Sequence, residues 1–222
     1  MSYKAEIKNY VPGKIICVGM NYKSHITEQD GRFPKKPVLF SKAKSCIIKN
    51  KENVIYPREV KELDYEVELA VVIGKKMKDV PASKVLDYIY GYTIMNDITA
   101  RDIQQNESQW YRSKSFDTFS PIGPVIVEKN KIPDPGNLSL RSYVNGEIRQ
   151  NGNTSDMIFG VYELISYISR SITLDAGDLI STGTPAGVGV FTKEKKLLKP
   201  GDIVICEIEA IGQLENKVVS GQ

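Results

Sequence analysis

Residues 65–74 contain the pattern that most restricts the fold of this chain. The segment reads Tyr-Glu-Val-Glu-Leu-Ala-Val-Val-Ile-Gly, so it alternates between polar and apolar side chains and then becomes continuously apolar. Alternation with a period of two is typical of a β-strand with one face in the core, and a continuous apolar run is typical of a fully buried strand. We therefore expect a strand that enters a hydrophobic core.

Other segments repeat this β-rich character. Residues 14–19 form a short β-rich run that ends in glycine, and residues 203–211 alternate after a Pro-Gly-Asp turn. Asn145 and Gly146 separate two strand-like runs, and an Asn-Gly pair in that place is the strongest short-range hairpin signal. Helical spacing of apolar residues is confined to residues 81–89, 99–108 and 156–169. The expected fold class is α+β, rich in β.

Three carboxylates stand out within these strands. Glu66 and Glu68 are two residues apart on the expected strand, so both point to one face with Cα atoms about 6.6 Å apart. Acidic residues on the solvent face of a strand are common, and this pair alone favours that ordinary explanation. Asp97 makes a shared cation site the better explanation, because it follows an apolar strand end, where an isolated charge is costly to bury. Three carboxylates without histidine or cysteine ligands suit Mg²⁺ or Mn²⁺ better than Zn²⁺.

His25 is the only histidine in the chain. If the chain turns helical at Ser24, His25 and Glu28 lie three residues apart on one helical face. A carboxylate in that position orients the imidazole and raises its basicity, as a general base requires. The alternative is structural: Ser24 would cap the helix, Glu28 would be a first-turn acid, and His25 would be a surface residue.

Composition excludes several other classes of protein. The net charge is +3 and the lysines are scattered, which indicates a solvated surface and no nucleic-acid partner. The N-terminal residues show no apolar signal segment, and the apolar run at residues 69–73 is too short to span a membrane. The odd, widely spaced Cys17, Cys46 and Cys206 suggest reduced, buried residues in a cytoplasmic protein. The glycine-rich residues 181–189 lack a P-loop pattern, so contact with a small anion and a plain connection both stay open.

Several motifs occur in an order that resembles the fumarylacetoacetate hydrolase family. They are Gly-Met-Asn-Tyr at 19–22 with His25 and Glu28, Asp-Tyr-Glu-Val-Glu-Leu-Ala at 64–70, Asn-Asp-Ile-Thr-Ala-Arg-Asp at 96–102, Lys-Ser-Phe-Asp at 114–117, Val-Asn-Gly-Glu at 144–147, Thr-Gly-Thr-Pro at 182–185 and Gly-Asp at 201–202. Each motif alone has little specificity, but the ordered set extends over about residues 14–219. The resemblance implies one catalytic domain over residues 1–222. Its fold would be a twisted, β-rich roll of mixed sheets with a few peripheral helices.

The resemblance also implies roles for individual residues. The metal ligands would be Glu66, Glu68 and Asp97, with Mg²⁺ or Mn²⁺ as cofactor. His25 and Glu28 would form a catalytic dyad on a segment able to close over the site, and Lys114 would place positive charge near the developing oxyanion. Gln104 and Thr184 are similar to positions that contact substrate. The protein would form a homodimer.

The implied reaction starts from a small 2-oxo acid. A metal-bound enolate accounts for C–C bond hydrolysis of an acylpyruvate-type acid, which is the activity we expect. The same enolate accounts for oxaloacetate decarboxylation or keto–enol tautomerisation, the close alternative. Two departures bear on this choice: Met20 stands where many acylpyruvate-cleaving members have arginine, and Ala43 stands where many have proline. Residues 40–42, 114–119 and 187–191 look more like a branch in which some members are thought to tautomerise oxaloacetate. A non-catalytic binding protein is less compatible with the complete set of residues.

Overall fold

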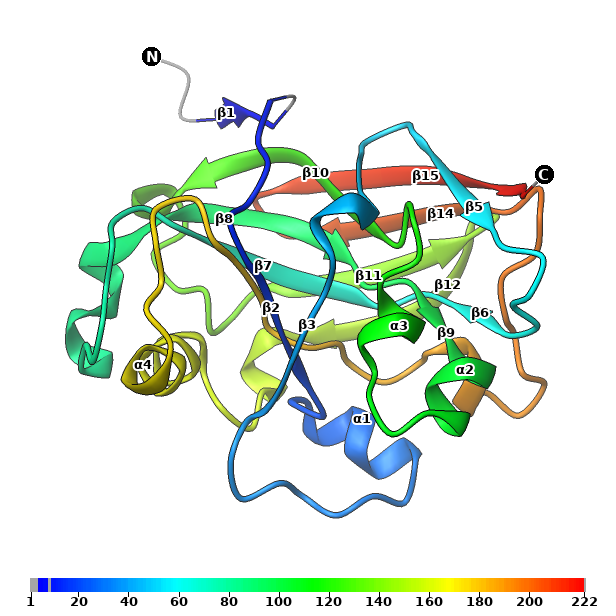
Figure 1. The fold of residues 1–222 in the computed structure, drawn as a ribbon, viewed down its shortest axis with the longest axis horizontal. Helices are drawn as coiled ribbons and strands as arrows, with labels where there is room; N and C mark the ends of the chain where they lie inside the picture. The colour runs from blue at the N-terminus through cyan, green and yellow to red at the C-terminus, as the bar shows by residue number, and fades with distance from the viewer. Residues whose placement is uncertain (1–3, 8, 222) are drawn as a thin grey trace.

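A large mixed sheet forms the centre of the protein in the computed structural model, which describes residues 4–7 and 9–221 (Figure 1). Its strand order is β1-β10-β8-β7-β13-β2-β3, and β4 pairs with β10. The strands β2 and β13 pair in parallel, as do β4 and β10, and the other pairs are antiparallel. The bounds are β1 Lys4–Glu6, β2 Ile15–Gly19, β3 Val38–Ser41, β4 Ile47–Lys49, β7 Val67–Ile73, β8 Ile89–Asn96, β10 Ser120–Glu128 and β13 Leu179–Ser181.

A second sheet, with the order β12-β11-β14-β15-β5, packs against the first. Its strands are β5 Asn53–Tyr56, β11 Ser139–Val144, β12 Glu147–Asn153, β14 Ile203–Ile208 and β15 Gly212–Ser220. Two short strands, β6 Leu63–Asp64 and β9 Thr99–Ala100, pair separately. Every residue of β7 is buried, because one face of this strand meets the second sheet and the other face meets the pocket and flanking elements. The predicted β-rich fold of mixed sheets with few helices is confirmed.

The helices lie at the periphery of the sheets (Figure 1). They are α1 Lys23–Glu28, α2 Arg101–Asn106, α3 Tyr111–Lys114 and α4 Val161–Ser171, with 3₁₀ turns η1 Lys44–Cys46, η2 Ala82–Tyr88, η3 Lys129–Lys131, η4 Thr154–Asp156 and η5 Gly189–Phe191. Among the described residues, no helix is long and apolar enough to cross a membrane.

The expected hairpin and cysteine states are confirmed. Asn145 and Gly146 have φ angles of 53° and 82°, the left-handed geometry that a two-residue turn between β11 and β12 requires. Cys17, Cys46 and Cys206 are all buried and unpaired.

The helical predictions need correction in their bounds and type. The segment expected at 81–89 is 3₁₀ rather than α-helical. In the segment expected at 99–108, residues 99 and 100 form β9 instead, because they pair with β6. The helix expected from residue 156 begins only at Val161, since Met157 forms a bridge with Tyr22 and the Ile158 amide donates to the carbonyl of Asn21 at 2.7 Å. Strand pairing of residues distant in sequence therefore overrides local helical spacing.

Candidate active site

The adjacent strands β7 and β8 bring three carboxylates together. Glu68 lies within β7, Glu66 directly precedes it, and Asp97 directly follows β8. The antiparallel register pairs Val67 with Asn96, so Glu66 and Asp97 become neighbours, and the Asp97 amide donates to the Glu66 carbonyl at 2.9 Å. One carboxylate oxygen from each of the three side chains lies within 4.8 Å of the others, and all three residues are buried. The structure thus assembles the carboxylates that the sequence singled out.

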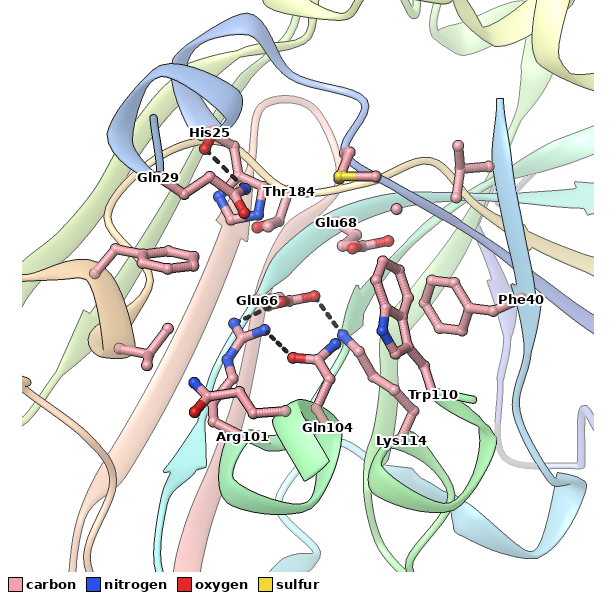
Figure 2. A pocket seen from close by; sticks show the side chains of 16 residues that line it. His25, Gln29, Phe40, Glu66, Glu68, Arg101, Gln104, Trp110, Lys114 and Thr184 are labelled. Atoms are coloured by element: carbon pink, nitrogen blue, oxygen red, sulfur yellow. Dashed lines mark hydrogen bonds and ion pairs between the residues drawn. The ribbon is translucent and has the colours of Figure 1, made fainter. Parts of the chain in front are cut away.

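Cationic side chains surround two of these carboxylates. Lys114 donates to Glu66 Oε2 at 2.7 Å and to Asp97 Oδ2 at 2.8 Å, and Arg101 donates to Glu66 Oε1 at 2.6 Å. Figure 2 shows Glu66 between these two cations. The second oxygen of Asp97 accepts a short hydrogen bond from the buried Lys42. Lys114, which the resemblance singled out, therefore faces the carboxylates directly.

Glu68 differs from the other two because no ion pair to it occurs in the described part of the chain. Its Oε2 atom accepts hydrogen bonds from Ser181 Oγ at 2.5 Å and from the Gly183 amide at 3.0 Å. Burial, and then repulsion from Asp97 and Glu66, raise the pKa of Glu68 to about 8. Burial acts in the same direction on Glu66, but Lys114 and Arg101 outweigh it and lower the pKa of Glu66 to about 2.

This arrangement fits a hard divalent cation. All three potential ligands are carboxylates, which Mg²⁺ and Mn²⁺ prefer, and they converge closely enough to share one ion. A cation at this point would also supply the counter-charge that Glu68 lacks. The residues that would hold it are Glu66, Glu68 and Asp97.

His25 and Glu28 form the expected pair on α1. His25 Nδ1 lies 2.6 Å from Glu28 Oε1, and Glu28 Oε2 accepts from the Gly187 amide at 2.8 Å. Because a carboxylate accepts a hydrogen bond, Nδ1 is the nitrogen that carries the proton, and Nε2 is left as an acceptor. The imidazole is buried and lines the same cavity as Glu66 and Glu68. The alternative reading of His25 as a surface residue is wrong.

Ser24 does not cap α1 as that alternative required. The N-cap position is Tyr22, without a side-chain cap, and the Ser24 amide donates to Asp156 Oδ2 at 2.9 Å. The anchor of α1 is therefore a carboxylate distant in sequence.

The cavity is small, about 240 Å³, and both predicted substrate-contacting residues line it. Gln104 Oε1 accepts from Arg101 at 3.0 Å, so the amide NH₂ of Gln104 is the group left to bind a ligand. The Thr184 hydroxyl donates to the Val67 carbonyl at 2.9 Å and accepts from Gln150 at 2.7 Å, so its proton is already used.

Several residues of the site were not assigned from sequence. Arg101 and Lys42 stood inside quoted motifs, and a cation close in sequence to a buried acid was a signal that could have identified Arg101. Phe191, Trp110 and Gln29 also line the cavity. Gln29 directly follows α1 and Phe191 ends a quoted motif, but neither residue type by itself indicated a place in the site, and Trp110 stood in no quoted motif.

We predict that Mn²⁺ or Mg²⁺ stabilises the protein through these carboxylates. A ligand at one hundred times its Kd stabilises the native state by about 2.7 kcal/mol. Thermal unfolding with and without metal after chelation should show a clear rise in Tm for the wild type. Glu68→Gln should lose most of this rise, while Glu163→Gln, on the exposed face of α4, should retain it. Equal rises in both variants would contradict a site at these carboxylates.

Comparison with known proteins agrees with the motif order. A family model described as Fumarylacetoacetate (FAA) hydrolase C-terminal matches residues 14–219. The mitochondrial oxaloacetate tautomerase Fahd2a of Rattus norvegicus is 50% identical over 209 residues, which are 94% of this chain and 67% of the rat protein. The structure of 2-hydroxyhepta-2,4-diene-1,7-dioate isomerase from Mycobacterium marinum superposes with a TM-score of 0.84 at 42% identity, covering 95% of this chain and 76% of that one.

A third similar protein has a different activity in its name. The fumarylacetoacetate hydrolase of Exiguobacterium antarcticum superposes with a TM-score of 0.88 at 43% identity, covering 96% of this chain and 77% of that one. The names of these relatives include a tautomerase, an isomerase and a hydrolase, so the family comprises enzymes with more than one outcome. By sequence and by structure, this chain belongs to the fumarylacetoacetate hydrolase family.

Proposed function

We propose that this protein is a metal-dependent enzyme that interconverts the keto and enol forms of oxaloacetate or a similar small 2-oxo acid. The observation behind this proposal is the position of His25. A single buried imidazole, oriented by Glu28, lines the same cavity of about 240 Å³ as the carboxylate cluster. A base beside a site for a cation is what proton transfer next to a keto group requires.

Two of the three relatives described above favour proton transfer over bond cleavage. The rat relative is named as an oxaloacetate tautomerase and the M. marinum relative as an isomerase. Neither kind of reaction adds water or removes a fragment. The sequence-based preference for C–C hydrolysis therefore becomes the second candidate.

The charge around the carboxylate cluster, which does not include Glu28 beside His25, favours an anionic substrate once a cation is bound. With Glu68 ionised, four buried carboxylates, Asp64, Glu66, Glu68 and Asp97, face the three cations Lys42, Arg101 and Lys114, which leaves one negative charge. A divalent cation would change this balance to one positive charge. The cavity would then attract a carboxylate, and its small volume favours a short acid.

The reaction requires a proton to move between carbon and oxygen. A bound cation would act as a Lewis acid that polarises the keto group. His25 Nε2 takes the proton from the carbon next to that group, the C–H electrons form the C=C bond, and the C=O π electrons move to the keto oxygen. The imidazolium of His25 then gives its Nε2 proton to that oxygen, which becomes the enol, and the imidazole is neutral again. Burial opposes the charge on Lys114, but Asp97 and Glu66 outweigh burial and raise the pKa of Lys114. Lys114 therefore stays cationic beside the oxygen that becomes negative.

We predict that His25→Ala slows oxaloacetate tautomerisation by about 10²–10⁴-fold, the usual contribution of a general base. The disappearance of enol absorbance measures the rate at saturating Mg²⁺. Lys23→Ala, on the exposed side of the same helix, is the control and should keep the wild-type rate. A wild-type rate in His25→Ala would remove the imidazole from the mechanism.

Hydrolytic cleavage stays the second candidate because the same His25–Glu28 pair could activate a water, and because the E. antarcticum relative is named as a hydrolase. We expect the wild-type protein to tautomerise oxaloacetate faster than it releases pyruvate from oxaloacetate or from an acylpyruvate. Enol absorbance and a pyruvate-coupled assay on the same preparation compare these rates. Faster pyruvate release from the acylpyruvate would favour the hydrolase, and faster release from oxaloacetate would favour a decarboxylase. No turnover of either acid would favour a binding protein.

We also propose that the protein is a homodimer, as the resemblance implies, and that it acts in the cytoplasm. Edge strands such as β3 and β12 leave backbone groups that a second copy could cover. Light scattering at micromolar concentration should give twice the 24.8 kDa mass of one chain. A mass of one chain would refute the dimer.

A further inference from the structure

A fourth buried carboxylate, Asp64, lies beside the cluster of Glu66, Glu68 and Asp97 without joining it. It ends β6 and is fully buried. Its Oδ1 atom accepts from the amides of Tyr65 at 2.9 Å and Gly189 at 2.7 Å, and its Oδ2 atom accepts from Arg101 Nε at 2.9 Å and the Val190 amide at 3.1 Å. Each oxygen therefore has two donors, and neither is free to hold a metal ion.

On one side, Asp64 fixes Arg101, whose guanidinium group also binds Glu66 of the carboxylate cluster. Arg101 uses Nε for Asp64, Nη2 for Glu66 and Nη1 for Gln104, so one guanidinium group sets the orientation of the Glu66 and Gln104 side chains. Asp64 removes the freedom of this guanidinium to turn. The direction of the Glu66 carboxylate thus depends on a residue that does not line the cavity.

On the other side, Asp64 fixes the wall of the cavity that faces the imidazole. Gly189 and Val190 belong to the turn η5, and the Phe191 ring at the end of that turn lies 5.9 Å from the His25 ring, centroid to centroid. Gly189 lies so close to Asp64 that a Cβ atom on this residue would be 2.7 Å from Asp64 Oδ1 and 2.6 Å from the Lys196 carbonyl oxygen. Only glycine allows the turn to reach the carboxylate.

From these contacts we infer that Asp64 is a positioning residue. It holds the turn η5, which packs against His25, and the carboxylate cluster at a fixed separation across the cavity. This role rests on the proposed function, because proton transfer requires the base and the cation site at matched positions on one small substrate. A misplacement of about 1 Å can cost about 10²-fold in rate. Asp64 acts through Arg101 and η5 rather than by touching substrate.

The test compares Asp64→Asn with Asp178→Asn. Asp178 is also fully buried, binds Lys14 at 2.7 Å and accepts two backbone amides, but these partners are Lys14 and Asp175 and belong to neither Arg101 nor η5. Both variants should lower Tm, since each leaves buried donors unpaired. We expect kcat for oxaloacetate to fall by about 10²-fold in Asp64→Asn alone. The Mn²⁺-induced rise in Tm should be unchanged in Asp178→Asn and smaller in Asp64→Asn, because the Glu66 carboxylate loses its fixed direction when Arg101 is free to turn. A full rise together with an unchanged kcat in Asp64→Asn would overturn the inference.

A second readout does not depend on turnover. Because His25 is the only histidine, a protein labelled with ¹³C-histidine gives one imidazole signal, which is sensitive to the ring of Phe191. We expect this signal to shift in Asp64→Asn and to stay in place in Asp178→Asn. Gly189→Ala, which pushes on Asp64 from the turn, should shift it as well and serves if Asp64→Asn fails to fold. An unchanged signal, with a loss of kcat no larger than in Asp178→Asn, would overturn the inference. If the wild type does not tautomerise oxaloacetate, the proposed function fails, and the imidazole signal still tests the position of Asp64.

Discussion

A buried chain of alternating charges is the interaction on which the rest of the site depends. It runs through Asp64, Arg101, Glu66, Lys114, Asp97 and Lys42. Such a chain is costly to bury, and removing one member leaves its neighbours uncompensated, at about 3–5 kcal/mol for a broken pair. It therefore has to be complete to be tolerated. Glu68 is the exception, since it lies beside the chain without an ion pair, and this is where a divalent cation would complete the balance of charge.

The backbone contributes to this arrangement by ending the ladder between β7 and β8 at the right residue. At the Val67–Asn96 pair the regular ladder ends, and one backbone hydrogen bond, from the Asp97 amide to the Glu66 carbonyl, follows it. The Glu66 amide donates to Asn96 Oδ1 at 3.0 Å, and the Val67 amide donates to Gln150 Oε1 at 3.0 Å. These side-chain oxygens satisfy both backbone amides without a further strand. The Glu66 carboxylate lines the cavity at this end of the ladder.

Sequence patterns anticipated the elements of the site better than the way those elements are joined. The strand around residue 68, the acid after the next strand and the pairing of His25 with Glu28 all follow from local spacing, and the structure places them together. The helix expected from residue 156 begins late because Asn21 and Tyr22 take its first backbone groups. The donor of Thr184 was also hidden from sequence, since it is consumed by the Val67 carbonyl.

The sequence by itself determined the alternating strands, the Asn-Gly hairpin, the buried cysteines and the identity of the carboxylates. These features depend on side-chain periodicity and turn chemistry, which act over a few neighbouring residues. Only the tertiary structure decided which donor compensates which acid. Lys42 meets Asp97 across 55 residues of sequence, and Asp64 meets the Val190 amide across 126. A buried charge needs a partner, but it does not specify where in the sequence that partner lies; the register of β7 against β8 and the path of the loop at residues 183–191 decide it.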